Sequence, residues 1–320
     1  MSAGEGQKFR ILSLDGGGAK GAYTLGALFE MEKRLGGGPL CEQFDLIFGT
    51  STGAVIAAFL GLGYKAESIY DEYKEVIPRA FSETSPKKRS LVLHQEALRI
   101  FQNQKFDSFK TRVSIICTNV DQENAKIFKS NVSQSYTGKA TFIPGFGATI
   151  VDVVVASAAA VPYFNSHTFS IPNDGLLHLI DGGFVANNPS LFALTDAVGA
   201  LKFDQKDISL ISIGVGKYKE VSPPSPLMAR IGKYLIDHHM PTDIFAKTLS
   251  ASADSTDKIV EFAFPHVSRF RLCEAYRGSD FVTHLLEADP YKLDKMYAFG
   301  RRTFCEREKE FDAAFATGIA

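Results

Sequence analysis

The chain has 320 residues, of which 45% are hydrophobic and 22% charged, so it can bury a sizeable core as one large α/β domain or two small ones. Its formal net charge of -1 argues against a general binder of nucleic-acid polymers, since such proteins usually carry an excess of basic residues. The four cysteines are far apart and form no C-x-x-C pair, which is typical of free thiols in a reducing compartment.

The chain begins with a predicted strand, a glycine loop and a helix. Phe9–Leu14 is a short β-rich run, residues 15–21 form the loop, and a helical pattern covers residues 22–35. The loop contains the G-x-G-x-x-G pattern of dinucleotide-binding proteins, so an NAD-dependent oxidoreductase has to be considered. That interpretation needs an acidic residue at the far end of the second strand, whereas Asp45 stands at its beginning.

The same loop favours a second interpretation. Successive glycines remove side-chain obstruction, so their backbone N–H groups can converge on an anion and form an oxyanion hole. Lys20 either adds positive charge near that anion or is a solvated lysine at the entry to the helix. Both roles stay open for Lys20.

The second predicted strand starts near Asp45 and runs through Gly49-Thr-Ser-Thr-Gly53 directly into a helix of small and apolar residues at 52–60. This order is typical of a nucleophile elbow, in which a sharp turn exposes the serine and the two glycines leave room for the backbone. The residue after Ser51 opens the helix, so its N–H points to where an oxyanion would form. The pattern also occurs by chance in glycine-bounded turns, but its context favours a catalytic Ser51.

The middle of the chain is predicted to alternate helices and strands. Residues 82–90 form a polar loop whose three adjacent basic residues can touch anionic lipid headgroups, although a solvated loop is the more common outcome. A packed helix is favoured over a strand for the small-residue run that Pro162 halts. The predicted helices are 65–81, 91–101 and 150–164, and the predicted strands are 113–118, which we expect to be central, 125–130, His167–Ile171 and 176–180.

A second candidate catalytic edge follows the last of these strands. Asp181, at the end of the strand, precedes two glycines and a Pro-started helix at 189–200. On its own, Asp-Gly-Gly is more often a turn than a site. A further central strand is predicted at 208–215.

Beyond Gly216 the pattern changes. A stiff connection with prolines at 223, 224 and 226 leads to helical patterns at 227–240, 242–260 and 293–315. There is no internal repeat, low-complexity tract or clear linker, so we expect a single domain over residues 1–320, with a core at about 9–215 and a helical C-terminal elaboration at 216–320.

Three motifs occur together in this chain: Asp15-Gly-Gly-Gly-Ala-Lys-Gly21, Gly49-Thr-Ser-Thr-Gly53, and Asp181-Gly-Gly183 with Asn187-Asn188-Pro189 behind it. In this order the set resembles the patatin-like phospholipase family over roughly residues 9 to 215. The resemblance implies a three-layer α/β/α sandwich around a mainly parallel sheet. It also implies hydrolysis of lipid acyl esters by a Ser–Asp dyad, with no metal and no cofactor.

Carried over residue by residue, the resemblance makes Ser51 the nucleophile and Asp181 the base. Its oxyanion donors are Gly16, Gly17 and Gly18, and the supporting motif residues are Gly49, Gly53, Lys20, Gly21, Gly182 and Gly183. The family often has Arg where Lys20 stands and Ala where Gly183 stands, and both exchanges keep charge or small size.

The dyad is chemically coherent. Ser51 needs a proton acceptor, and a carboxylate whose pKa burial has raised can serve without an imidazole. The rival is a Ser-His-Asp triad of the α/β-hydrolase type, in which the histidine follows the acid. Four histidines follow Asp181 and so qualify by position: His238, His239, His266 and His284. His178, three residues before Asp181, is expected to be structural.

A narrower resemblance, to bacterial patatin-like effectors of anti-phage defence, rests on the compact opening at residues 11–28 and the modest length. It implies a phospholipase that a cyclic dinucleotide activates against the cell's own membrane, with homo-oligomerisation on activation as one switch. A catalytically silent nucleotide-binding protein on the same fold is the alternative. No nucleotide pocket can be derived from the residues.

Localisation follows from what the sequence lacks. The N-terminal residues show no apolar secretion signal, and no apolar run approaches the roughly 18 residues that span a bilayer. We therefore expect a cytoplasmic protein that associates peripherally with the inner membrane when active, at a phospholipid surface. Residues 78–90 and 223–226 are the candidates for gating lipid access.

Overall fold

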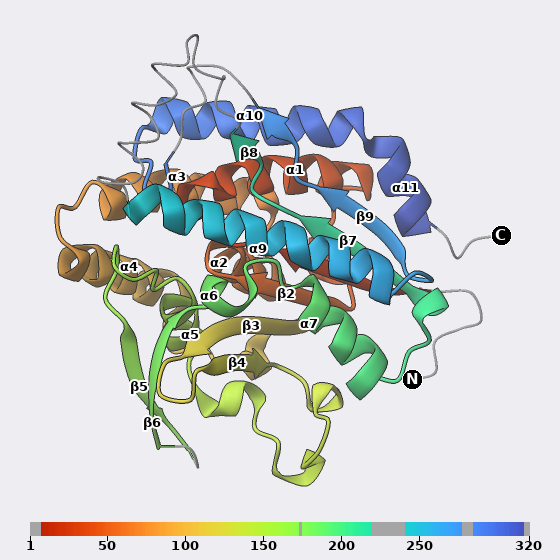
Figure 1. Ribbon diagram of the computed structural model, residues 1–320, viewed down its shortest axis with the longest axis horizontal. Coiled ribbons are helices and arrows are strands. Elements are labelled where there is room, and N and C mark those ends of the chain that lie inside the picture. The colour runs from red at the N-terminus through yellow and green to blue at the C-terminus, as the bar shows by residue number, and fades with distance from the viewer. Residues whose placement is uncertain (1–7, 173–174, 219–240, 277–283, 317–320) are drawn as a thin grey trace.

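The computed structural model describes residues 8–172, 175–218, 241–276 and 284–316 (Figure 1). They form an eight-stranded sheet in the order β5-β6-β3-β2-β1-β7-β9, with β4 paired to β3, and a short parallel pair of β8 and β10. The strands are β1 Phe9–Leu14, β2 Leu46–Thr50, β3 Arg112–Asn119, β4 Asn124–Lys129, β5 His167–Ile171, β6 Gly175–Asp181, β7 Ile208–Ile213, β8 Lys217–Tyr218, β9 Ser268–Leu272 and β10 Ala275–Tyr276.

Helices cover both faces of the sheet, which confirms the predicted α/β class and its three layers (Figure 1). One face carries α1, α2, α3, α5 and α10, and the other carries α6, α7 and α9. The helices are α1 Gly21–Arg34, α2 Thr52–Leu62, α3 Ala66–Phe81, α4 Pro86–Phe101, α5 Ile150–Ser157, α6 Gly183–Ala186, α7 Ser190–Thr195, α9 Pro241–Ala263, α10 Pro290–Glu306 and α11 Glu308–Ala316.

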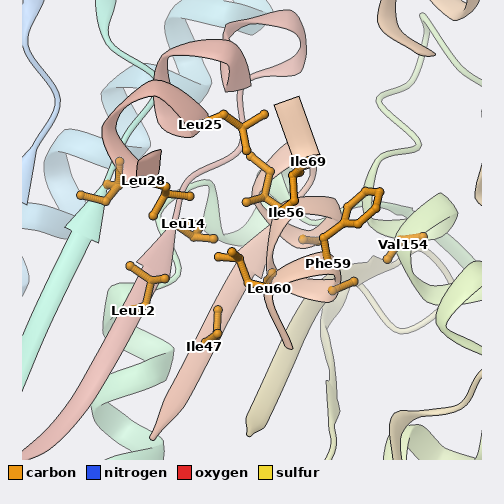
Figure 2. Close-up of a cluster of buried hydrophobic side chains, with 14 of the residues drawn as sticks. Leu12, Leu14, Leu25, Leu28, Ile47, Ile56, Phe59, Leu60, Ile69 and Val154 are labelled. Carbon is orange, nitrogen blue, oxygen red and sulfur yellow. The ribbon is translucent and has the colours of Figure 1, made fainter. Parts of the chain in front are cut away.

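The layers follow from the alternation of side chains along buried strands. In β1, Leu12 and Leu14 point into the larger hydrophobic cluster, while Phe9 and Ile11 point into the cluster on the opposite face. Figure 2 shows Leu12 and Leu14 facing apolar side chains of α1 and α2 in that larger cluster. Strands β1, β2, β3 and β7 are buried on both faces and mostly apolar, as the sequence predicted for the central strands at 113–118 and 208–215.

The sheet is parallel through β3-β2-β1-β7-β9 and antiparallel where β4, β5 and β6 join it. β4 pairs with β3 along Ser114–Asn119, so β6, which pairs with Cys117–Asn119, must lie on the other side of β3, in line with β2. β2 pairs with β3 up to Ile116, and β6 takes over at Cys117. Since β2 and β6 run in opposite directions along one side of β3, their carboxyl ends meet.

The prediction of a polar loop at 82–90 is wrong. α4 begins at Pro86, and Ser85 caps it by accepting a hydrogen bond from the Lys88 N–H at 3.3 Å. A serine followed by proline at the first helical position is a helix-start signal, which outweighed the polar composition of the segment. The three basic residues therefore lie in the first turn of a helix.

The C-terminal part also differs from a purely helical addition. β9 lies within it and extends the parallel sheet beside β7, a position that the mixed polar sequence Ser-Arg-Phe-Arg-Leu did not indicate. The predicted helix at 293–315 is divided at Arg307 into α10 and α11, and that at 150–164 ends at Ser157. The predicted proline connection at 223–226 and helix at 227–240 lie outside the described residues.

No helix among the residues that the structure describes is long and apolar enough to cross a membrane. All four cysteines are described, and each carries a free thiol; Cys117 is fully buried in β3.

Candidate active site

Ser51 lies at the sharp turn between β2 and α2, as predicted. Its backbone has φ 54° and ψ -124°, a conformation that non-glycine residues rarely adopt. The neighbouring glycines permit the close packing of this turn: a methyl group on Gly49 would overlap the backbone at Gly53, and one on Gly53 would overlap the carbonyl oxygen of Leu14. The turn thus holds the serine at the carboxyl end of β2.

The hydroxyl of Ser51 donates a hydrogen bond to Asp181 Oδ2 at 2.6 Å. The two residues are 130 positions apart and meet because the ends of β2 and β6 converge along β3. Ser51 is 8% exposed and Asp181 only 2% exposed. The predicted nucleophile and the predicted proton acceptor are therefore within hydrogen-bond distance of each other and nearly buried, which is the geometry that activates a serine.

Burial raises the pKa of Asp181 to about 7, although the hydrogen bonds from Ser51 and from the Gly183 N–H act in the opposite direction. The Gly183 N–H donates to Oδ1 at 2.7 Å, so each carboxylate oxygen has one donor. The backbone of Asp181 is held as well, because its carbonyl accepts from the Thr118 hydroxyl at 2.8 Å. A carboxylate with this pKa is well matched to accept and return a proton near neutral pH.

The glycine loop lies beside Ser51: a methyl group added to Gly16 would stand 3.0 Å from the Ser51 Cβ. The Gly16 N–H already donates to the Asn187 carbonyl at 3.0 Å, so it is not available to an oxyanion in this conformation. Within the described residues, the N–H groups of Gly17 and Gly18 have no such acceptor. Of the three predicted oxyanion donors, Gly17 and Gly18 are therefore the two that remain candidates.

The remaining glycines of the three motifs pack closely around Ser51 and Asp181. Gly21 begins α1, and a methyl group there would overlap the Thr52 side chain; on Gly182 it would overlap the Ile116 carbonyl. Gly183 begins α6 and its added methyl would stand 2.9 Å from Asp181 Oδ1. Lys20 is half-buried directly before α1, and its two interpretations stay open.

A narrow pocket with a cavity volume of about 70 Å³, open to solvent, is lined by Ser51 and Asp181. Apart from Ser51, Asp181 and Glu72, the walls of the pocket are mainly apolar. They come from helices α2, α3, α4 and α9, the glycine loop, the segment after α5 and the Leu285–Leu286 segment. The side chains that these helices contribute include Val55, Ile56, Phe59, Ile69, Tyr73, Val76, Ile77, Leu93, Ile100 and Leu249. Apolar walls of this kind are suited to contact a hydrocarbon chain.

No histidine in the described part of the chain bonds to Ser51 or Asp181. His266 is exposed just before β9 begins, at the opposite edge of the parallel sheet from Ser51, and His284 is also exposed. His178 lies 3.5 Å from Asp121, whose side chain is exposed, and bonds to neither Ser51 nor Asp181. His238 and His239 lie outside the described residues.

Several supporting residues carry no signal in the sequence. Ser157, at the end of α5, accepts from the Ser51 N–H at 2.9 Å and donates to the Ile116 carbonyl at 2.6 Å. Tyr73 and Thr52 both donate to the Gly18 carbonyl, at 2.5 and 2.9 Å. A serine or tyrosine in a helix is too common for its sequence position to reveal such a contact.

Residues 12–194 match the patatin-like phospholipase family profile. A cUMP-AMP-activated phospholipase of Escherichia coli is 41% identical over 301 residues, which are 94% of this chain and 92% of that protein. A cGAMP-activated phospholipase of Vibrio cholerae is 29% identical over 243 residues, 68% of this chain and 67% of that one.

Among solved structures, human GIVD cytosolic phospholipase A2 in complex with methyl gamma-linolenyl fluorophosphonate aligns with a TM-score of 0.53. The alignment covers 98% of this chain and 60% of the human one at 12% identity, so it indicates a common fold.

Proposed function

The chain belongs to the patatin-like phospholipase family, and on this premise we propose that it hydrolyses acyl ester bonds of membrane phospholipids through Ser51 and Asp181. The observation that carries the proposal is the 2.6 Å hydrogen bond between the serine hydroxyl and a buried carboxylate, both of which line an apolar pocket. A serine poised in this way attacks a carbonyl carbon, and the cavity selects an acyl chain.

The proposed reaction has two halves. In the first, Ser51 Oγ attacks the ester carbonyl while its proton passes to Asp181 Oδ2. The N–H groups of Gly17 and Gly18 and the N–H at the start of α2 are placed to stabilise the oxyanion. The tetrahedral intermediate collapses, the proton moves from Asp181 to the leaving alkoxide, and the lysophospholipid departs, leaving the acyl group on Ser51.

In the second half, water replaces the lysophospholipid. Asp181, again ionised, accepts a proton from the water as its oxygen attacks the acyl carbonyl. The second tetrahedral intermediate releases the Ser51 oxygen, which takes the proton back from Asp181, and the fatty acid leaves. Protons, bonds and charge balance over the cycle, with the carboxylate returning to its initial state.

Regulation by a cyclic dinucleotide is the second part of the proposal, with a role in anti-phage defence. Its support is the similarity over 94% of the chain to a cUMP-AMP-activated phospholipase, which includes the C-terminal part beyond the family profile. A phospholipase made in the cytoplasm needs to be silent until a signal arrives. Activation through homo-oligomerisation is the form of switch that we propose.

The proposed substrate surface is an anionic phospholipid membrane, contacted peripherally from the cytoplasm. Helix α4 supports it, because Leu93 on its inner side lines the cavity while Lys87, Lys88 and Leu91 are exposed on its outer side. Basic and apolar side chains on one exposed helical face fit the headgroup region of an anionic bilayer.

The decisive experiment measures fatty-acid release from phospholipid vesicles and from a soluble short-chain ester, each with and without cUMP-AMP or cGAMP. Ser51→Ala and Asp181→Asn should abolish release while the fold persists, and Asp121→Asn, which changes an exposed carboxylate, should not. Activity that survives Asp181→Asn but is lost with a histidine would establish the triad instead. Nucleotide binding without hydrolysis under every condition would establish a silent sensor.

A further inference from the structure

A buried ion pair lies directly behind the glycine loop. Arg271 of β9 holds Asp15 with two hydrogen bonds, Nη1 to Oδ1 at 2.8 Å and Nη2 to Oδ2 at 2.5 Å. The Arg271 side chain is 13% exposed and that of Asp15 is 3% exposed. This parallel, two-bond contact is the geometry for which the planar guanidinium is suited and an ammonium group is not.

The strand register explains how a residue from the C-terminal third reaches the loop. Arg271 pairs with Ser212 of β7, and Ser212 pairs with Ser13 of β1, two residues before Asp15. The guanidinium therefore extends over β7 toward the end of β1. On its way, Nη1 also donates to the Ser212 hydroxyl at 2.8 Å.

The contact belongs to a buried polar network that joins the glycine loop to the Asn187-Asn188-Pro189 motif. The Ser190 hydroxyl donates to Ser212 at 3.0 Å and lies 2.9 Å from the Ser13 hydroxyl, and the Ser190 N–H donates to Asn188 Oδ1 at 3.0 Å. The Asn187 carbonyl accepts from the Gly16 N–H. The first two residues of the loop are thus fixed from behind, by a side chain at Asp15 and by a backbone bond at Gly16.

We propose that Arg271 is a positioning residue for the oxyanion donors: by clamping Asp15 it sets the direction in which the next N–H groups, those of Gly17 and Gly18, point. Arg271 lies outside residues 12–194, so the family match does not include it. The inference rests on the proposed function, since it concerns the same reaction. Its consequence is that the C-terminal strand β9 is part of the catalytic apparatus as well as of the sheet.

Two substitutions separate geometry from charge. Arg271→Lys keeps the charge but loses the two-bond fork, and Arg271→Met leaves the Asp15 carboxylate buried without a partner. Both should lower kcat on a soluble short-chain ester, on the order of 10-fold to 100-fold for a small displacement of the donors, with KM changed less than about threefold. The rate at which a fluorophosphonate labels Ser51 should fall in parallel, because its phosphoryl oxygen needs the same donors.

A matched control exists between the end of β4 and the helical segment at 196–200. Lys129 and Asp196 form an ion pair with side-chain exposures of 14% and 2%, at 2.6 Å, away from the loop. Lys129→Met should lower the melting temperature about as much as Arg271→Met but leave kcat and the labelling rate unchanged. Amide hydrogen exchange of Gly16 and Ala19, whose N–H groups donate to the Asn187 and Leu285 carbonyls, should increase in the Arg271 variants only, a readout that requires no turnover.

The outcomes are distinct. Folded Arg271→Lys and Arg271→Met proteins with wild-type kcat, labelling and loop exchange would overturn the inference, and so would a Lys129→Met protein that loses as much kcat. If even the wild-type protein released no fatty acid with or without nucleotide, the proposed function would fail instead. Loop exchange would then still decide whether Arg271 holds the loop.

Discussion

At the scale of single residues, the site places two unfavourable features side by side. Ser51 has a strained backbone, and Asp181 is a carboxylate 2% exposed with no cationic partner among the described residues. Each costs folding free energy, and together they give a serine hydroxyl that donates directly to a carboxylate whose pKa burial has raised to about 7.

The raised pKa predicts the pH dependence of catalysis. Asp181 accepts a proton only when ionised, so kcat/KM on a soluble ester should fall roughly tenfold per pH unit below an apparent pKa near 7 and level off above it. A pH-rate profile of the wild-type protein beside Asp121→Asn checks this. A profile flat down to pH near 5 would contradict the role of Asp181.

The same raised pKa predicts that the folded protein is less stable when Asp181 is ionised, although ionised Asp181 is the form that favours catalysis. The Asp181 pKa lies above its ordinary value of 3.8, so the protonated form stabilises the fold at low pH, and this contribution is lost as pH rises through about 7. Asp181→Asn should therefore raise the melting temperature more at about pH 9 than at about pH 5. Thermal unfolding at both pH values tests it, and an equal or reversed effect would argue against a carboxylate destabilised by burial.

The strain at Ser51 can be measured with two inactive variants. Ser51→Gly should be more stable than Ser51→Ala, on the order of 1 kcal/mol, because glycine adopts φ 54° without strain. At exposed Ser82, where φ is -70°, the order should reverse, since glycine only adds entropy to the unfolded chain. Urea unfolding of the four variants provides the comparison. Equal stability of both Ser51 variants would show that the turn is relaxed.

At the scale of elements, the arrangement of β6 decides the site. The sequence predicts that Asp181 ends a strand, but it does not reveal the direction of that strand. In a parallel strand, Asp181 would lie at the carboxyl edge beside the other parallel strands. The antiparallel pairing of β6 with β3 instead brings it to meet the end of β2. The turn at Ser51 and the meeting of the carboxyl ends of β2 and β6 both require neighbouring backbone segments to approach closely.

The close approach of the β1 backbone makes Gly53 sensitive to substitution by a larger residue. A methyl group at this position would overlap the carbonyl oxygens of Leu14 and, at 2.7 Å, Asp15, both fixed in or next to β1. Gly53→Ala should destabilise the protein by about 2 to 3 kcal/mol and lower activity further by shifting Ser51. Gly38→Ala, whose added methyl would have its nearest neighbour at 3.7 Å, should be close to neutral. Denaturant unfolding of both variants tests the pair, and equal losses would contradict the packing explanation.

The exposed face of α4 predicts how the protein meets a membrane. In a Ser51→Ala background, which prevents hydrolysis, Lys87→Glu with Lys88→Glu should weaken binding to anionic vesicles at least tenfold, at roughly 1 kcal/mol per charge. Lys202→Glu with Lys206→Glu, at exposed positions beside the opposite edge of the sheet, should not. Vesicle co-sedimentation measures binding. Equal loss in both pairs would indicate only a general effect of net charge.

At the scale of the whole molecule, the C-terminal part is built into the fold. α10 lies along α1 (Figure 1), and the contact is so close that a methyl group on Gly26 or Gly300 would overlap the backbone of the other helix. Pairs of Arg34 with Glu308 and Asp312 add exposed ion pairs at the end of α1. These contacts support the prediction of a single domain, which remains a prediction.

Similarity along nearly the whole chain predicts the activating signal. Fatty-acid release should be low in the basal state and rise with cUMP-AMP, with a weaker response to cGAMP, because the match to the cUMP-AMP-activated relative is higher and longer. Light scattering in the same titration should show a larger assembly if oligomerisation is the switch. Full activity without nucleotide, or activation by cGAMP alone, would refute this prediction.

The sequence by itself determined the local chemistry. The bounds of β1 and β5, the elbow at Ser51 and the carboxylate at the end of β6 follow from short patterns, because turn geometry and strand periodicity are properties of neighbouring residues. Even there the start of α4 was missed, since composition was weighed above the Ser-Pro helix-start signal.

Only the tertiary structure decided which of these groups act together. The bond that occupies the Gly16 N–H, the meeting of β2 with β6, the apolar cavity and the contact of Arg271 with Asp15 each join residues from distant segments. Such contacts depend on strand direction, register and burial, which no local pattern encodes. The pKa of Asp181 belongs to the same class, because burial raises it and burial exists only in the folded chain.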